Sequence, residues 1–192
     1  MAYTTIDDGS AHFQTATYTG TGSNQSITNG GNSNLQPDWV WVKDRGATND
    51  HKITDSSRLA NSKPSLTLES NTTNAQYDDA DPMSTDSFDS DGFTIGTNGN
   101  YNTNTNTYVA WQWKANGGTT SSNTSGNITT TVQANTTAGF SIVTWEGANS
   151  TATLGHGLGA VPEMIISKCI DTTQEWGVYH KDVGNDDYLH LN

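Results

Sequence analysis

The stretch Pro37-Asp38-Trp39-Val40-Trp41-Val42-Lys43 recurs in outline as Pro162-Glu163-Met164-Ile165-Ile166-Ser167-Lys168. Both copies place an acidic residue after proline and a lysine at the end. Successive side chains of a β-strand point to opposite faces of its sheet, so the apolar residues Trp39 to Val42 require cover on both sides. We therefore predict a central β-strand here and a related strand at the second copy.

The similarity extends on both sides of this stretch. Phe13-Gln14-Thr15-Ala16-Thr17-Tyr18-Thr19-Gly20 matches Phe140-Ser141-Ile142-Val143-Thr144-Trp145-Glu146-Gly147, and Leu66-Thr67-Leu68 matches Leu189-His190-Leu191. Three blocks in the same order indicate an internal repeat. The sequence therefore predicts two related units in one chain.

The second copy lacks the end of the first. Copy one continues through Ser87-Phe88-Asp89-Ser90-Asp91-Gly92-Phe93 and closes with Tyr108-Val109-Ala110-Trp111-Gln112-Trp113-Lys114-Ala115. Neither block follows in copy two, so its sheet is expected to have exposed edges and apolar faces. We expect further polypeptide of the same protein, or a partner chain, to complete it.

The boundaries follow from this repeat. Residues 1–115 are predicted to form a complete β-sandwich unit, and residues 128–192 the first part of a second, incomplete unit. Between them, residues 116–127 are rich in Gly, Ser, Thr and Asn, the composition of a flexible linker. Short strands separated by turn signals such as Asp91-Gly92 favour an all-β fold of two packed antiparallel sheets, jelly-roll or concanavalin A-like.

Two side-chain placements are predicted in detail. Period-two alternation puts Val109, Trp111 and Trp113 on one face of their strand and Ala110, Gln112 and Lys114 on the other, which predicts a half-exposed strand. The single cysteine, Cys169, follows an apolar run, where a buried structural thiol is common.

Composition narrows the function classes. Leu, Ile, Val and Phe together make up only about 15% of the chain, a share typical of disorder. Six Trp and seven Tyr compensate, because each buries a large apolar area. A formal charge of −12 disfavours nucleic acid and membrane surfaces as partners. We expect neither nucleic-acid binding nor membrane insertion. We also expect no signal peptide, because residues 1–8 have neither a basic region nor an apolar core.

The blocks quoted above, together with Tyr18-Thr19-Gly20-Thr21-Gly22 and Gly155-His156-Gly157-Leu158-Gly159, resemble a repeat in tail-fibre and other virion proteins of marine bacteriophages. Those proteins are often described as concanavalin A-like, lectin-like domains. The resemblance covers nearly the whole chain and implies a structural protein of a viral particle, commonly a trimer, involved in host attachment. It transfers no catalytic residues.

Two binding sites are considered. Trp111 and Trp113, with Trp39 and Trp41, are candidates for a platform that stacks on sugar rings, against the alternative that they form sandwich core. The acidic residues Asp78, Asp79, Asp81, Asp86, Asp89 and Asp91 could supply oxygen ligands to calcium, with Asp89 and Asp91 in an Asp-x-Asp-Gly turn. The alternative is a solvated acidic loop without a cofactor.

These observations lead to one expected function and three alternatives. The chain is expected to be a non-enzymatic structural component of a bacteriophage particle, the N-terminal, virion-attaching part of a tail fibre. It would be made in the bacterial cytoplasm, released by lysis and located in the virion. Expected partners are a tail adaptor or nozzle or capsid protein, further copies of the chain, and host surface polysaccharide. A carbohydrate-binding adhesin, a head fibre or capsid decoration protein, and a glycosidase of the depolymerase type are the alternatives.

Overall fold

The computed structural model describes residues 6–79, 85–184 and 187–192, and the described chain is almost entirely β. A three-residue 3-10 helix η1 (Gly9–Ala11) and a four-residue helix α1 (Gly99–Asn102) are the helical elements among these residues. The strands of the first unit are β1 (Phe13–Thr19), β2 (Gln25–Thr28), β3 (Trp39–Asp44), β4 (Lys52–Asp55), β5 (Leu66–Glu69), β6 (Tyr77–Asp78), β7 (Thr85–Asp89), β8 (Gly92–Ile95) and β9 (Thr107–Trp113). Those that follow are β10 (Ser121–Asn123), β11 (Thr130–Asn135), β12 (Phe140–Thr144), β13 (Met164–Ser167), β14 (Gly177–His180) and β15 (Leu189–His190).

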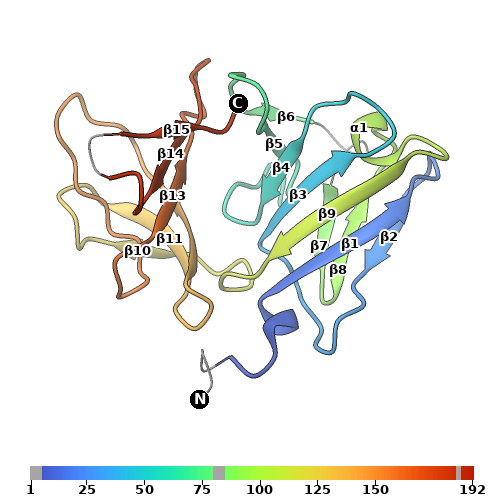
Figure 1. Cartoon of the computed structure of the whole chain (residues 1–192), viewed down its shortest axis with the longest axis horizontal. Helices are drawn as coiled ribbons and strands as arrows, with labels where there is room; N and C mark the ends of the chain where they lie inside the picture. Colours follow the sequence, from blue (N-terminus) through green and yellow to red (C-terminus); the bar gives the residue numbers. More distant parts are fainter. Residues whose placement is uncertain (1–5, 80–84, 185–186) are drawn as a thin grey trace.

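Two antiparallel sheets form the first unit, as expected for an all-β sandwich (Figure 1). One sheet has six strands in the order β1-β9-β3-β4-β5-β6, and the other has the order β2-β8-β7. The finer prediction of a jelly-roll or concanavalin A-like topology stays a prediction. Apolar side chains from both sheets and from α1 fill the space between them: Ile27, Val40, Val42, Phe93, Ile95, Tyr101, Tyr108 and Ala110.

The turn between β7 and β8 requires its glycine. Gly92 has a φ of 111°, a conformation that residues with a Cβ rarely adopt. A Cβ at this position would also overlap the carbonyl oxygen of Ile27. The predicted Asp91-Gly92 turn is therefore present and joins β7 to β8, and the absence of a Cβ lets Gly92 lie close to Ile27 before the end of β2.

Strand β9 corrects one prediction. It lies between β1 and β3, and the face expected to be exposed is the core face, with Ala110 and Gln112 both fully buried. The small Ala110 fits beside the large core tyrosines, and the Gln112 amide donates a hydrogen bond to Asn29. The opposite face, with Trp111 and Trp113, is half-buried.

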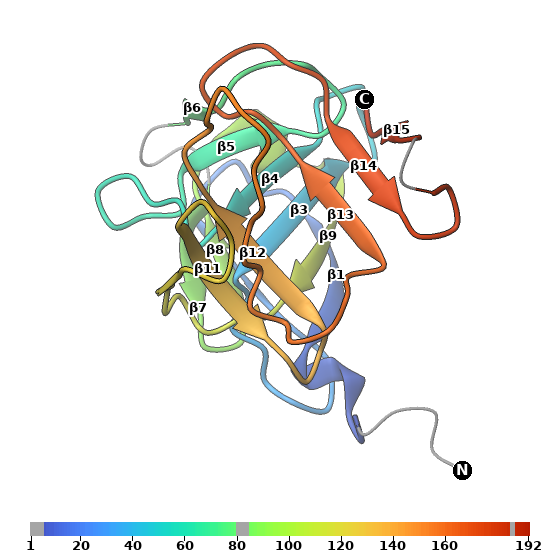
Figure 2. The same cartoon turned by 90° about the vertical axis from the view of Figure 1, so that its left-hand side faces the viewer.

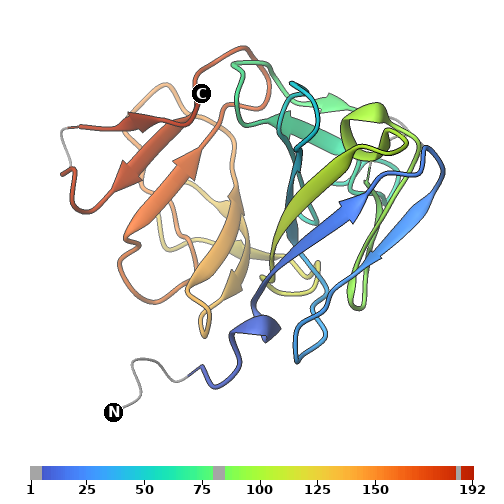
Figure 3. The same cartoon turned by 45° about the vertical axis from the view of Figure 1, so that its right-hand side comes forward.

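The second unit consists of two three-stranded sheets, β10-β11-β12 and β13-β14-β15. Both lie over the outer face of the six-stranded sheet of the first unit (Figure 2). Successive strands run β11, β12, β13 and β14 across this layer in both turned views (Figures 2 and 3). The chain thus has three layers of strands, with the six-stranded sheet in the middle.

Strand registers in the two units correspond. Trp39 pairs with Asp55 and Trp41 with Ile53, and the residues 125 positions later, Met164 with His180 and Ile166 with Val178, pair in the same way. Val178 next pairs with Leu189, as Ile53 pairs with Leu68. The structural equivalent of Leu68 is therefore Leu189, which shifts the third block of the sequence comparison by two residues.

Two smaller expectations need adjustment. Within residues 116–127, expected to be a linker, Ser121–Asn123 forms β10 and pairs with β11. Cys169 is exposed, so the prediction of a buried thiol is wrong. It follows β13 where the chain leaves the sheet, and its sulfur lies 3.4 Å from the Thr172 hydroxyl. No helix among the described residues is long and apolar enough to cross a membrane.

Candidate assembly site

Four tryptophans form one cluster on the outer face of the six-stranded sheet, and we call it the tryptophan row. Trp39 and Trp41 come from β3, and Trp111 and Trp113 from β9. Ring centroids are 4.6 Å apart for Trp39 and Trp113, and 5.8 Å apart for Trp41 and Trp111. The two strands pair in a register that sets these residues opposite each other, so alternation places all four on one face.

The second unit covers much of this row. The Phe140 ring, at the start of β12, lies 6.0 Å from Trp39 and 6.2 Å from Trp113. Ile166 of β13 packs in a second apolar cluster with Trp39, Trp41 and the buried residues Ile53, Leu68 and Trp176. The row is therefore part of a junction between the two units, and its four rings are half-buried.

Hydrogen bonds also hold the junction. The Gln133 side chain is fully buried, and its amide nitrogen donates to the hydroxyls of Ser56 and Ser57. Trp176 donates its ring N–H to the carbonyl oxygen of Glu69 at 2.8 Å. Since buried polar groups without partners cost free energy, these bonds make the packing specific as well as apolar.

A buried carboxylate ties the chain between the units to the first sheet. Asp38, with no exposed surface, accepts hydrogen bonds from the backbone N–H groups of Ala115, Gly117 and Gly118. The Ser56 hydroxyl also donates to it. The acidic residue after Pro37 therefore anchors the first residues that follow β9.

A second buried charge cluster lies in the sandwich of the first unit. The Lys52 ammonium donates to Glu69 at 2.5 Å, and their side chains are 2% and 7% exposed. Burial raises the pKa of Glu69, but hydrogen bonds from Lys52, Asn74 and Tyr77 outweigh it and hold the pKa at about 2. The same burial and the neighbouring Glu69 raise the pKa of Tyr77. These hydrogen bonds keep the buried pair charged, so the loss of either partner would leave an uncompensated charge inside the protein.

The second unit exposes several large apolar side chains. Val40 of β3 is 1% exposed, whereas its repeat equivalent Ile165 of β13 is 47% exposed. Six of the eight exposed large apolar residues in the described chain lie in the second unit. They are Trp145, Val161, Met164, Ile165, Tyr188 and Leu189.

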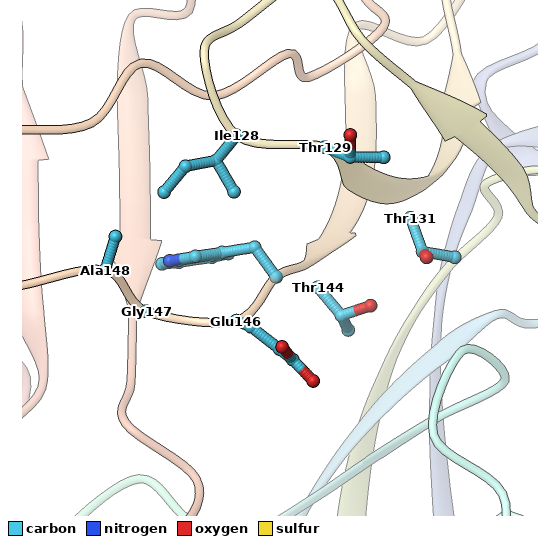
Figure 4. A pocket seen from close by; sticks show the side chains of 8 residues that line it. Ile128, Thr129, Thr131, Thr144, Glu146, Gly147 and Ala148 are labelled. Atoms are coloured by element: carbon cyan, nitrogen blue, oxygen red, sulfur yellow. The ribbon is translucent and has the colours of Figure 1, made fainter.

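A hollow of about 620 Å³ lies beside Trp145, at the end of β12 (Figure 4). Ile128 and Trp145 both line the hollow, with Thr144 and Glu146 on either side of Trp145 in the sequence. The ring is 42% exposed. An aromatic face beside a carboxylate and a hydroxyl offers both apolar and polar contacts to a ligand.

The acidic residues considered for calcium have partners within the protein. Asp89 accepts hydrogen bonds from the hydroxyls of Ser87 and Thr94, and Asp91 accepts one from the backbone N–H of Leu35. Asp78, Asp79 and Asp86 bond to Ser65, Asn98 and Lys63 respectively. Asp81 lies outside the described residues. Among the described residues, no group of three or more His, Cys, Asp and Glu side chains is placed to hold a metal ion.

Sequence reasoning grouped the four tryptophans and missed what covers them. The repeat identified Phe140 as the equivalent of Phe13. The surface that Phe140 contacts could not be predicted, because it depends on how the two units pack together. Trp176 and Gln133 have no signal of their own in the repeat. The apolar match of Ile166 to Trp41 is the signal from which a covered face on both strands could have been predicted.

The fold and the junction define a class: an all-β sandwich module that carries a second, open β-layer on its outer face. Residues 8–192 match the family described as domain of unknown function DUF7483, and the chain belongs to that family. Comparison with curated proteins gives no match, and comparison with solved structures gives none either.

Proposed function

We propose that the chain is a structural component of a bacteriophage particle, the virion-attaching part of a tail fibre. The observation that supports this most is the concentration of exposed apolar residues on the second unit. Met164 and Ile165 on β13 and Leu189 on β15 are about half exposed. A concentration of exposed large apolar residues in one part of a protein is typical of contact sites between proteins.

The junction supports a mechanical role. Much of the tryptophan row is covered by Phe140 and Ile166, so aromatic area that would suit a ligand is used to hold two β-layers together. The Asp38 hydrogen bonds to Gly117 and Gly118 add rigidity where the chain passes between the units. A rigid module with one open apolar layer suits docking on another subunit of an assembly, with trimers of this chain as the expected state.

The experiment is to locate the protein in purified particles encoded by the genome that carries this sequence. Mass spectrometry gives its copy number, and gold-labelled antibody against residues 6–79 gives its position. A fixed copy number with label on the tail is expected. Label on the capsid would favour a head fibre or decoration protein, and absence from purified particles would contradict the proposal.

Carbohydrate binding is a second candidate, because the Trp145 ring is 42% exposed beside Glu146. Host surface polysaccharide is then expected to quench tryptophan fluorescence in a saturable manner. Trp145→Ala should abolish the quenching, and Trp111→Ala, on the half-buried row, serves as the comparison. If the polysaccharide leaves the fluorescence of the unmodified protein unchanged, this candidate is wrong.

A further inference from the structure

Strands β12 and β13 each have one hydrogen-bonded neighbour among the described residues. β12 pairs with β11 and β13 pairs with β14, yet the two sheets that they belong to remain separate. Both strands lie in the same layer over the first unit (Figures 2 and 3). The second unit therefore presents two strand edges toward each other without a strand between them.

The first unit shows which strand belongs there. Its β1 and β3 are the repeat equivalents of β12 and β13, and β9 lies between them. Ala110 of β9 pairs with Ala16 on one side and with Val42 on the other. The equivalents of Ala16 and Val42 are Val143 and Ser167. In the described strands, no residue pairs with both of them as Ala110 pairs with Ala16 and Val42.

The loop that joins β12 to β13 does not take this place. Its backbone bonds to the segment before β11: Ile128 donates to the carbonyl oxygen of Thr153, and the Thr130 hydroxyl donates to that of Gly155. Gly157 then lies close to Val132 and Ala134 of β11. The loop thus covers β11.

The lengths of the strands point to the same edges. The outermost strands of the second unit, β10 and β15, have three and two residues, and short edge strands are a common protection against unwanted pairing. The inner edges belong to β12 and β13, with five and four residues. The longer edges, which offer more backbone groups, are the ones that face each other.

We propose that β12 and β13 together bind one extended strand of a partner polypeptide, which pairs antiparallel with both and repeats the side-chain alternation of β9. On the face toward the tryptophan row, its side chains are large and apolar, because they lie between Ile142 and Ile166. On the other face they are small at the position between Val143 and Ser167. This inference depends on the repeat and on the strand edges, and it holds whether or not the protein belongs to a virion.

The exposed side chains agree with this occupant. Ile165 corresponds to the fully covered Val40, and Trp145 corresponds to Tyr18, which stacks on Tyr108 of β9 at 5.0 Å. Both second-unit residues are more than two-fifths exposed. In the first unit, the equivalent side chains are covered by β9 and by the opposite sheet. The described part of the second unit has no such cover at Ile165 and Trp145.

The test uses a labelled peptide with the sequence of residues 105–115, which contains β9, added to the 192-residue protein. Fluorescence anisotropy is expected to show saturable binding of one peptide per chain. The matched control peptide carries Ala110→Pro, which removes a backbone donor and cannot pair on both sides. Its affinity should be weaker by about tenfold or more, because the bonds of one residue to two strands are lost.

Crosslinking then locates the peptide. In a Cys169→Ser background, with oxidised glutathione as the oxidant, a peptide with Ala110→Cys should form a disulfide with Val143→Cys on β12 in one variant and with Ser167→Cys on β13 in a second. Ser122→Cys, on the outer strand β10, should react at least about tenfold more slowly, since the effective concentration at a paired site is high. The circular dichroism of each variant without peptide verifies that it is folded.

Four results would overturn the proposal, three of them from the binding and crosslinking measurements. They are absence of binding by the unmodified peptide, equal binding of the proline peptide, and a reaction at Ser122→Cys as fast as at Val143→Cys and Ser167→Cys. Exchange of the peptide into the first unit in place of β9 would also count against it, because that peptide would lie near neither engineered cysteine of the second unit.

Discussion

Removing the Phe140 ring should loosen the second unit from the first. Phe140 is half-buried, and its ring contacts both Trp39 and Trp113 across the junction. Phe→Ala changes in full cores cost about 3–5 kcal/mol, so a half-buried ring is worth about 2 kcal/mol here. Since about 1.4 kcal/mol is a factor of ten, the opening of the junction should become about thirtyfold more frequent.

Amide hydrogen exchange measures this opening strand by strand. In Phe140→Ala, the amides of β11 and β12 are expected to exchange about thirtyfold faster, while those of β3 and β9 change little. Tryptophan emission should shift to longer wavelength, because Trp39 and Trp113 gain contact with water. Urea unfolding followed by both signals tests whether the second unit is lost first.

Phe13→Ala is the matched control. Phe13 also contacts Trp113, with ring centroids 4.7 Å apart, but it belongs to β1 of the first unit and is 40% exposed. Phe13→Ala should lower the free energy of unfolding by less than about 1 kcal/mol and leave the amide exchange rates of β11 and β12 unchanged. If Phe140→Ala leaves the exchange of β11 and β12 at the unmodified rate, the junction described above is wrong.

Three further results are expected. In the folded protein the pKa of Glu69 is about 2, below its ordinary value of 4.5. The contribution of the Glu69 carboxylate to the free energy of unfolding is therefore complete above about pH 4.5 and is lost as the pH falls toward 2. Urea unfolding across this pH range should show that the free energy of unfolding falls by an amount on the order of 2 kcal/mol. In Glu69→Gln most of this pH dependence should be absent. Lys52→Met leaves the Glu69 carboxylate buried without its cation and should cost about 3 kcal/mol of unfolding free energy. Lys181→Met, which breaks an exposed pair with Glu163, should cost less than about 1 kcal/mol, and equal losses would contradict this ranking. Asp38→Asn weakens the acceptor for three backbone N–H groups and should make residues 116–118 more sensitive to limited proteolysis, so an unchanged cleavage rate would refute the anchoring role.

Much of the first unit follows from local patterns. Trp39 to Val42 alternate apolar side chains on both faces, and the strand is indeed inside a sheet with cover on each side. The Asp91-Gly92 turn needs a conformation that glycine adopts readily. Such features depend on a few neighbouring residues, so the sequence is enough to predict them.

The errors have a common cause, which is that burial depends on distant parts of the chain. Gln112 is polar, yet it faces the core because Asn29 receives its hydrogen bond. The pattern Leu66-Thr67-Leu68 repeats itself after two residues, so its alignment with Leu189 could slip by two without changing the faces. Only the pairing of Leu189 with Val178 determines the register.

The candidate site was predictable in part for the same reason. Residues 128–192 contain no block equivalent to β9, and exposed strand edges were predicted from this. The repeat did not show that the second unit packs on the tryptophan row, because that requires the arrangement of two layers. The sugar-stacking and calcium predictions for Trp39, Trp41, Trp111, Trp113, Asp89 and Asp91 stay predictions.

The most direct test of the open second unit is residue-level amide exchange, measured by NMR, on the 192-residue protein alone. In an antiparallel strand with one neighbour, alternate amides have no partner, whereas a strand between two neighbours uses all of them. We expect alternate amides of β12 and β13 to exchange rapidly and all amides in the middle of β9 to be protected. Continuous protection along β12 and β13, equal to that of β9, would show that these edges are already paired and would contradict the account.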